Sequence, residues 1–441
     1  MDQQQALDLC DLVLQASRAD QTEAVLSTEA TALTRFANNT IHQNVAEEGV
    51  SATVRAVVGQ RVGVASSTDV SPEGLRELAD AAYRLALVSA ADEDFVSLPG
   101  PLPYTGKTDF ADAAAAACGP EQRAATVAEA IALAAAEDFT ASGACSTGLI
   151  EIAVANSLGV RSAQRRSMAE MSLVVSGAGG SGYAHTCSPR LADLSGGSLG
   201  RIATEKCRAS RDPQPLPPGE YTVILEAEAV ADMIMMLSMY GLGALAVQEG
   251  RSFVNGRLGE QICGDNITIW DDGLDPRGHR LAYDFEGVPK QRVPLITAGV
   301  AEGVVWDSYT AHKEGRQSTG HGLPAPNSWG PVPINLFVAA GDSSVADMIA
   351  QTRRGVLVTR FHYTNMVHPI KTVLTGMTRD GTFLIEDGQI ARAIRNLRFT
   401  QSILEALSCV SLISREGKLA DYVWAPAMCV DRFTFSSATE F

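Results

Sequence analysis

Apolar residues near the start of the chain recur at the spacing of one helix face. Residues 3–19 carry Ala, Leu, Cys and Val at such positions, which predicts an amphipathic helix. Runs rich in Val and Thr follow and predict strands, and the last two are separated by Gly59 and Gln60 as in a hairpin. A second helix is predicted from Ser71, with Pro72 at its first position. The predicted strands cover residues 33–39, 50–58 and 61–66.

The same order of elements returns further along the chain. A helix is predicted at 120–136, and a second at 197–209. The strands between them are predicted at 147–156, 168–176 and 182–186. Two short matches accompany this order: FANN at 36–39 with VANS at 154–157, and SATV at 51–54 with MSLV at 171–174. We therefore expect an internal duplication, with repeats at 1–100 and 118–211.

A Pro-rich segment separates two halves of different character. Residues 212–219 hold four prolines, which predicts a semi-rigid linker. Beyond it one helix is expected at 227–240, and the pattern is then mostly that of strands. Asp387-Gly388 between apolar runs predicts a hairpin over 382–390. The same turn signal recurs at Asp272-Gly273 and Asp380-Gly381.

These patterns together predict an α+β fold with two domains. The N-terminal domain, residues 1–211, is an α/β domain of helices and antiparallel strands with internal duplication. The C-terminal domain, residues 220–441, is mainly antiparallel β.

Composition narrows the possible partners. The chain has 35 Lys and Arg against 51 Asp and Glu, a net charge of −16, so neither nucleic acid nor an anionic membrane is expected to bind. The N-terminus lacks the basic and apolar regions of a signal peptide, and no apolar run is long enough to span a membrane. The eight cysteines are scattered, which favours buried free thiols in a cytoplasmic protein.

Several familiar catalytic and binding motifs are absent or lack the structural context that they need. Residues 177–182 match GxGxxG, but no helix pattern follows, so a hairpin turn is expected there in place of a dinucleotide site. No Gly-x-Ser-x-Gly elbow is present. The histidines of the C-terminal half show no short ligand spacing, so no metal is expected in this chain; they are His279, His312, His321, His362 and His368.

Three segments resemble one protein family, that of TldD and its partner TldE, also called PmbA. They are residues 33–63, the linker, strand and helix at 215–240, and residues 359–390 with their Arg-Phe-His-Tyr strand and double Asp-Gly turn. The resemblance runs essentially end to end. In the TldD branch the helix after the linker carries His-Glu-x-x-x-His, which with a distant Cys looks like a zinc peptidase site.

This chain departs from that zinc motif. The matching hexapeptide starts at Ala227, keeps Glu228 and ends at Asp232, and the Cys-Gly-Lys-like segment reads Ser-Arg-Glu-Gly-Lys at 414–418. The resemblance is therefore to the TldE/PmbA branch, the non-metal partner of a TldD-type subunit in a heterodimeric peptidase for unfolded or small peptides. It implies no cofactor in this chain and zinc in the partner subunit, and it leaves open whether the chain forms a homodimer where the partner is absent.

Some residues are candidates for the peptide cleft or the interface. His321 lies in a Gly-flanked loop that the resemblance places near the cleft, although an ordinary surface loop would look the same. Met235 and Met239 belong to a cluster of four methionines, which either packs in the core or forms an adaptable surface. His362 and Asn335 complete this set of candidates.

Two hypotheses follow from the degenerate motif. In the first, the chain is a binding and scaffolding subunit without catalysis of its own, which holds a peptide by strand addition at a β edge. In the second, it is an autonomous, diverged metal-dependent hydrolase that uses Glu228, Asp232 and a histidine such as His321. For Glu228 the simplest interpretation is an acidic residue in a first helical turn, favoured by the helix dipole. The family's older name, modulator of DNA gyrase, fits poorly with the net charge of −16.

Overall fold

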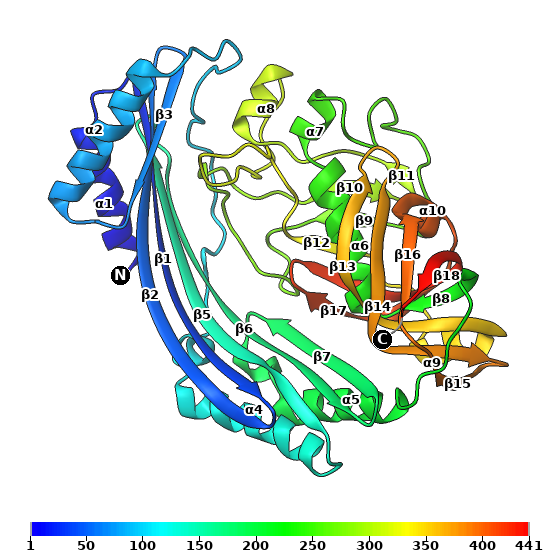
Figure 1. Ribbon diagram of the computed structural model, residues 1–441. Coiled ribbons are helices and arrows are strands. Elements are labelled where there is room, and N and C mark those ends of the chain that lie inside the picture. Colours follow the sequence, from blue (N-terminus) through cyan, green and yellow to red (C-terminus); the bar gives the residue numbers. More distant parts are fainter. Residues whose placement is uncertain (1, 440–441) are drawn as a thin grey trace.

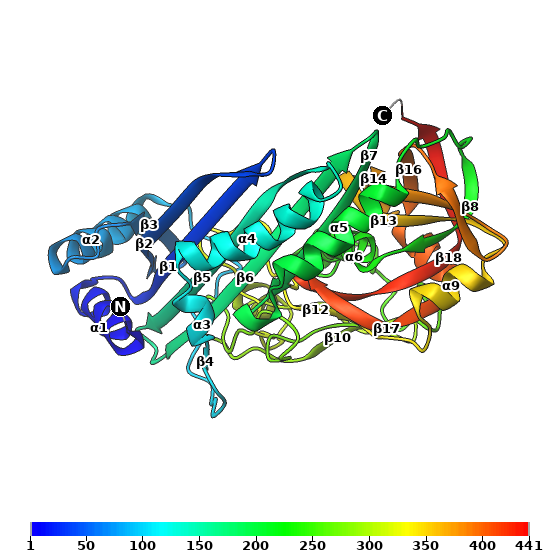
Figure 2. The ribbon, with the colours of Figure 1, turned by 90° about the horizontal axis from the view of Figure 1, so that it is seen from below.

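A large curved sheet and a second, more closed sheet make up the molecule (Figure 1). The computed structural model describes residues 2–439. The N-terminal sheet has seven strands in the order β3-β2-β1-β5-β6-β4, with β7 paired to β6. Its helices cover one face, α1 and α2 towards one end and α4 and α5 towards the other, and the C-terminal half lies against the opposite face (Figures 1 and 2). The fold is thus α+β, as predicted.

The N-terminal sheet is built from two copies of one order of elements. Each copy has a helix, three antiparallel strands and a helix. The first comprises α1 (Gln3–Ala16), β1 (Gln21–Ala37), β2 (Thr40–Val58), β3 (Arg61–Ser67) and α2 (Pro72–Val88). The second comprises α4 (Pro120–Ala135), β5 (Thr140–Asn156), β6 (Arg161–Gly177), β7 (Gly180–Ser188) and α5 (Gly196–Ala209). Between and beside them lie β4 (Asp109–Phe110), α3 (Ala113–Ala116) and a short 3-10 helix (Leu191–Asp193).

Capping and turn chemistry explain several of these ends. Ser71 accepts a hydrogen bond from the Gly74 N–H at the start of α2, and Pro72 occupies its first turn as predicted. The turn between β6 and β7 places Ala178 and Gly179 at positive φ, so residues 177–182 form the expected hairpin.

The strands β1 and β2 are much longer than predicted. Residues 21–32 of β1 were not predicted as strand because Thr, Ser, Glu and Ala mix there without a clear alternation. They pair in continuous register with both β2 and β5, so the neighbouring strands impose the conformation.

The C-terminal half forms an eleven-stranded sheet in the order β11-β10-β9-β12-β18-β16-β14-β13-β8. Because β8 also pairs with β18, the strands β18, β16, β14, β13 and β8 close into a ring. The strands are β8 (Gly219–Leu225), β9 (Ile269–Asp271), β10 (Val293–Thr297), β11 (Val300–Ala301), β12 (Leu336–Val338), β13 (Arg354–His368), β14 (Val373–Glu386), β15 (Gln389–Ala393), β16 (Leu397–Ser402), β17 (Val410–Ala420) and β18 (Val423–Ala438). The helices are α6 (Ala227–Gly241), α7 (Ala244–Gln248), α8 (Ser308–Lys313), α9 (Val345–Gln351) and α10 (Ile403–Ser408).

The turn predictions in this half were right at one position and wrong at another. Asp387 and Gly388 have positive φ and join β14 to β15, as predicted. Asp380-Gly381 lies inside β14 and does not end a strand. Both residues have positive φ where the pairing of β13 with β14 shifts register, so they form an irregularity within a long hairpin.

Helix α6 packs against β13 and β18, and its apolar residues join the largest core cluster, which fills the C-terminal half. Its N-terminus points towards α5 and β7 of the N-terminal sheet, whose residues contact it.

None of the described helices is long and apolar enough to cross a membrane. All eight cysteines are free thiols. The domain boundaries predicted from the linker stay a prediction.

Candidate functional site

The residues that match the family motif lie at the junction between the two halves. Ala227, Glu228 and four of the residues 414–418 line a cavity of about 410 Å³ between β7 and α5 on one side and the start of α6 and β17 on the other, whereas Asp232 does not line it. The charged or polar side chains along it include His185, Lys206, Glu226, Glu228, Ser414, Glu416 and Lys418. The two motif segments, at 227–232 and 414–418, thus meet in space although nearly 190 residues separate them.

Glu228 is held by two cationic side chains. Its Oε1 atom lies 2.6 Å from Lys418 Nζ and 3.1 Å from His185 Nδ1. The other ring nitrogen of His185 lies 3.4 Å from an oxygen of Glu170. Glu170, His185, Glu228 and Lys418 therefore form a row of alternating charge, in which each group is stabilised by its neighbours.

The protonation states in this row follow from burial and pairing. Burial opposes ionisation of Glu228, but hydrogen bonds from His185 and the charge of Lys418 outweigh it and lower its pKa to about 2. Burial disfavours the charged imidazole, yet hydrogen bonds to Glu170 and Glu228 raise the pKa of His185 to about 9. The hydrogen bond from His185 lowers the pKa of Glu170. At neutral pH the carboxylates of Glu228 and Glu170 are therefore ionised and the His185 ring is charged.

The other two motif positions behave differently. Ala227 opens α6, directly after the N-cap Glu226, whose carboxylate lies 2.5 Å from Lys206 Nζ. Asp232 accepts a hydrogen bond from the Thr364 hydroxyl. Burial, with the nearby charges of Asp421 and Glu228, raises the pKa of Asp232 to about 6.

The donors at this place do not fit a zinc ion. Ala227 offers no ligand atom, and the Oε1 atom of Glu228 already receives the Lys418 ammonium. Both nitrogens of His185 face carboxylates, so neither lone pair is free when the ring is charged. Among residues 2–439, no group of three or more His, Cys, Asp or Glu side chains is arranged to hold a metal ion.

Two of the predicted cleft residues lie together in the interior. His321 is 2% exposed, and its Nε2 atom lies 2.9 Å from Asp271 Oδ1. The Asn335 N–H donates to Asp271 Oδ2 over 2.7 Å, and the Asn335 side chain donates to the His279 carbonyl. The alternative of a surface-loop histidine is wrong, because the loop turns inward and His321 pairs with a buried carboxylate. A role of His321 or Asn335 in peptide binding stays a prediction.

The remaining candidates are closer to the surface. His362 is half-buried on β13, and its ring contacts that of Tyr363 at 4.5 Å. Desolvation and the charges of Arg379 and Arg360 lower its pKa. Met235 packs against the C-terminal core, and Met239 is half-buried on α6. None of these three lines the cavity at the start of α6.

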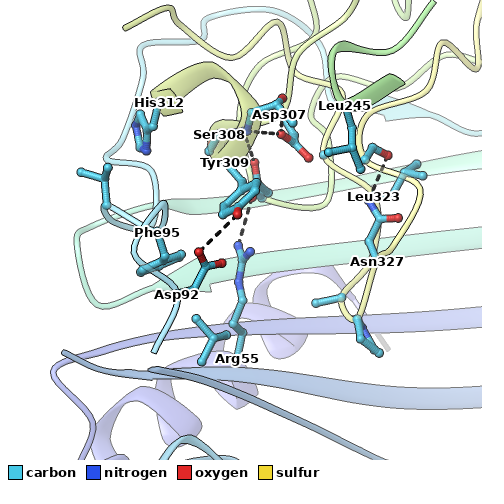
Figure 3. A pocket seen from close by; sticks show the side chains of 18 of the residues that line it. Arg55, Asp92, Phe95, Leu245, Asp307, Ser308, Tyr309, His312, Leu323 and Asn327 are labelled. Carbon is cyan, nitrogen blue, oxygen red and sulfur yellow. Dashed lines mark hydrogen bonds and ion pairs between the residues drawn. The ribbon is translucent and has the colours of Figure 1, made fainter. Parts of the chain in front are cut away.

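A second cavity, of about 350 Å³, lies at another part of the junction (Figure 3). Arg55 of β2 reaches it and lies 2.9 Å from Glu23 and 3.1 Å from Glu286. Glu286 also accepts a hydrogen bond from the Ser308 N–H at the start of α8, and Tyr309 donates to Asp92 (Figure 3). These contacts join the N-terminal sheet to the C-terminal half.

Sequence reasoning missed His185, Lys418, Glu170 and Lys206. Lys418 was within reach, because it keeps the Gly-Lys end of the Cys-Gly-Lys-like motif. His185 lies on β7, in the second copy of the repeat, and no local pattern marks it as a partner of a helix in the other half.

Comparison with known families and proteins identifies the family to which this fold belongs. Models of the PmbA/TldA metallopeptidase family match in three parts: domain 1 over residues 22–86, the central domain over 98–211 and the C-terminal domain over 218–437. The chain belongs to this PmbA/TldD family.

Curated relatives match over part of their length. A metalloprotease of Methanothermobacter thermautotrophicus is 27% identical over 225 residues, which is 50% of this chain and 48% of the relative. A metalloprotease TldD homolog of Haemophilus influenzae is 27% identical over 206 residues, 46% of this chain and 42% of the relative. The matched part of the chain thus spans about half the length of these relatives or less.

Solved structures match over nearly the whole chain. TldE from Thermococcus kodakarensis superposes with a TM-score of 0.88 at 23% identity and covers 98% of this chain and 99% of that one. A Thermotoga maritima protein named as a modulator of a DNA gyrase gives a TM-score of 0.85 at 20% identity, with coverages of 97% and 99%. These two likenesses establish the shared fold.

Proposed function

We propose that this chain is a non-catalytic, TldE/PmbA-like subunit of a heterodimeric zinc peptidase of the TldD/TldE type, which degrades or processes unfolded or small peptides. The chain contributes part of the dimer interface and of the substrate cleft. Zinc and catalysis belong to the TldD-type partner. The complex works in the cytoplasm.

One observation carries the proposal: Lys418 and His185 hold Glu228 in a closed ionic row beside Ala227. A catalytic zinc site needs three protein ligands and an open position for water. Here the place of a general base is filled by an ion pair, and Glu228, with a pKa lowered to about 2, is too weak a base to take a proton at neutral pH. The shared fold with TldE of Thermococcus kodakarensis supports the same assignment.

The test compares the purified chain with its mixture with the TldD-type protein of the same organism. We expect no stoichiometric zinc and no turnover of an unstructured peptide by the chain alone, and zinc-dependent turnover by the mixture. Glu228→Gln in this chain should leave the activity of the mixture in place.

The competing assignment, an autonomous metal-dependent hydrolase, predicts the reverse. Stoichiometric metal and turnover by the isolated chain, abolished by Glu228→Gln, would overturn the proposal. A variant of the partner in which the Glu of its His-Glu-x-x-x-His motif is changed to Gln serves as the control, since only that change should abolish activity of the mixture.

A further inference from the structure

A third cavity lies next to the motif cavity, and most of the charged side chains that line it are cationic. It measures about 780 Å³ and lies between β7, β17, the segment around β4 and the loop after β9. It shares four residues with the motif cavity, namely Thr186, Asp193, Gly417 and Lys418. The two cavities are therefore adjacent, and β7 and β17, which contact each other, contribute to the lining of both (Figure 1).

The lining of this third cavity is rich in positive charge, although the protein as a whole is acidic. Its lining includes five cationic side chains, Lys107, Arg190, Arg277, Arg280 and Lys418, against only two carboxylates, Asp112 and Asp193. Both carboxylates are already engaged. Asp112 accepts from the Leu191 N–H, and Asp193 pairs with Arg190. The chain as a whole carries a charge of −16, so this cavity stands out as a local cationic site.

Arg280 is the cation best placed to bind an anion. Arg190, Arg277 and Lys418 each have a carboxylate partner, at Asp193, Asp275 and Glu228. Within residues 2–439, no carboxylate pairs with Arg280, and its buried Nε atom has no hydrogen-bond partner. Its guanidinium lies 4.5 Å from the centre of the Phe110 ring, which holds it in place without neutralising it. A planar guanidinium fixed in this way matches a carboxylate through two parallel hydrogen bonds.

The strands that border the cavity can guide an extended chain. In the described residues, β7 pairs only with β6 and β17 only with β18. On its other side β17 bonds the backbone of residues 341–343 through residues 413–415, so only its later part, which includes the cavity-lining residues 417–419, lacks a partner there among the described residues. Main-chain groups of a peptide can bind along this part and along β7 whatever the peptide's sequence. A peptide lying along them from the motif cavity would bring one end or one side chain to Arg280.

We propose that this cationic pocket binds a carboxylate of an extended peptide and so makes the chain select acidic or free-acid peptide ends. Arg280 makes the direct contact, and Lys107, which is exposed and has no ion-pair partner in the described part of the chain, adds long-range attraction. The inference rests on the proposed function in one respect, that the ligand is a peptide.

The test measures binding to the isolated chain by fluorescence anisotropy, with no partner subunit and no turnover. The probes are unstructured peptides of one sequence, labelled at the N-terminus, with a free C-terminal carboxylate, with a C-terminal amide, or with an amide and one internal Asp. We expect a carboxylate to bind about tenfold more tightly than the neutral amide at about 150 mM salt, the gain of one charge-assisted bidentate contact. The free-acid and the Asp peptide separate a terminal from a side-chain carboxylate.

Variants of Arg280 and of a remote arginine separate the direct contact of Arg280 from a general effect of charge. Arg280→Met should abolish the preference for a carboxylate, Arg280→Lys should keep part of it, and Arg76→Met on the remote helix α2 should keep all of it. Equal affinity for all three peptides, or a preference that survives Arg280→Met with an unchanged thermal melt, would overturn the proposal. Loss of folding in Arg280→Met leaves the decision to Arg280→Lys and to the peptide series on the unchanged chain. Because no partner is present, a failure here leaves the zinc test of the mixture untouched.

Discussion

Lys418 places its ammonium 2.6 Å from a carboxylate oxygen of Glu228. This ion pair joins strand β17 of the C-terminal half to helix α6. The contact lies where the two motif segments of the family meet. Both charges of this pair come from side chains of the chain itself. His185 adds a second cation from the N-terminal sheet, so the pair also ties the two halves together.

Removal of the Lys418 ammonium should destabilise the fold at neutral pH. We expect Lys418→Met to cost about 1 to 2 kcal/mol, less than a fully buried pair because the lysine is 42% exposed. Urea unfolding at pH 7 measures this change. The folded pKa of Glu228 is lowered to about 2, so its contribution is present above its ordinary value of 4.5 and is lost as pH falls towards 2. The difference from the unchanged chain should therefore shrink in that window, and Lys418→Arg should show little loss.

The protonation of His185 should appear in the pH dependence of stability. Its folded pKa is raised from 6.5 to about 9, so the stabilisation is complete below pH 6.5 and is lost as pH rises through 9. That shift corresponds to roughly 3 kcal/mol. Unfolding free energies of His185→Gln should be flatter between these values, whereas His42→Gln, on the exposed part of β2, should follow the unchanged chain. A His185→Gln profile parallel to the unchanged chain would contradict the assigned charge.

Local patterns predicted the long helices α1, α2, α4, α5 and α6 and several hairpins because their signals are local, but they missed the short helices α7 to α10 of the C-terminal half. Pro72, the apolar faces of α4 and α6 and the Asp387-Gly388 turn each act within a few residues. The long strand β1 could not be predicted in full, since its polar half is fixed by pairing with β2 and β5.

The candidate site shows the same division. Ala227, Glu228 and Asp232 could be identified because they match the hexapeptide of the family that the sequence resembles. Their partners could not, because Lys418 and His185 reach Glu228 from distant parts of the chain. The burial of His321 could not be predicted, since flanking glycines usually indicate an exposed loop. Gly320 has a φ of +75° and lies against the Pro289 backbone, which turns the loop inward and carries His321 to Asp271.

The free energy of unfolding should fall when one charge of the buried pair Asp271 and Lys290 is removed, and it should recover in part when both are removed. Asp271 is fully buried beside Lys290, whose Nζ lies 3.5 Å away, and it also accepts from His321 and Asn335. Asp271→Asn should cost about 3 kcal/mol or more because it leaves the lysine charge buried without its partner. Adding Lys290→Met should recover a large part of that loss, as measured by urea unfolding. A double variant as unstable as the sum of the single variants would show that the two groups do not interact.

Arg55 should hold the two halves together across the cavity of Figure 3. It bridges Glu23 of the N-terminal sheet and Glu286 of the C-terminal half, and both carboxylates are buried. Arg55→Met should cost about 3 kcal/mol at pH 7, since two buried carboxylates lose their cation. Burial already raises the pKa of Glu23, and the loss of Arg55 raises it further.

The stability that Arg55→Met loses should depend on pH. A carboxyl group whose folded pKa is raised destabilises the fold above its ordinary pKa, so the cost of Arg55→Met should be larger at pH 8 than at pH 5. Limited proteolysis should also cleave the variant faster in the segment between α2 and β4, which contacts the same cavity. Arg84→Met, on the exposed side of α2, is the matched control. Adding Glu23→Gln and Glu286→Gln to Arg55→Met should restore part of the stability and remove the pH dependence, and a triple variant that keeps the pH dependence would contradict this account.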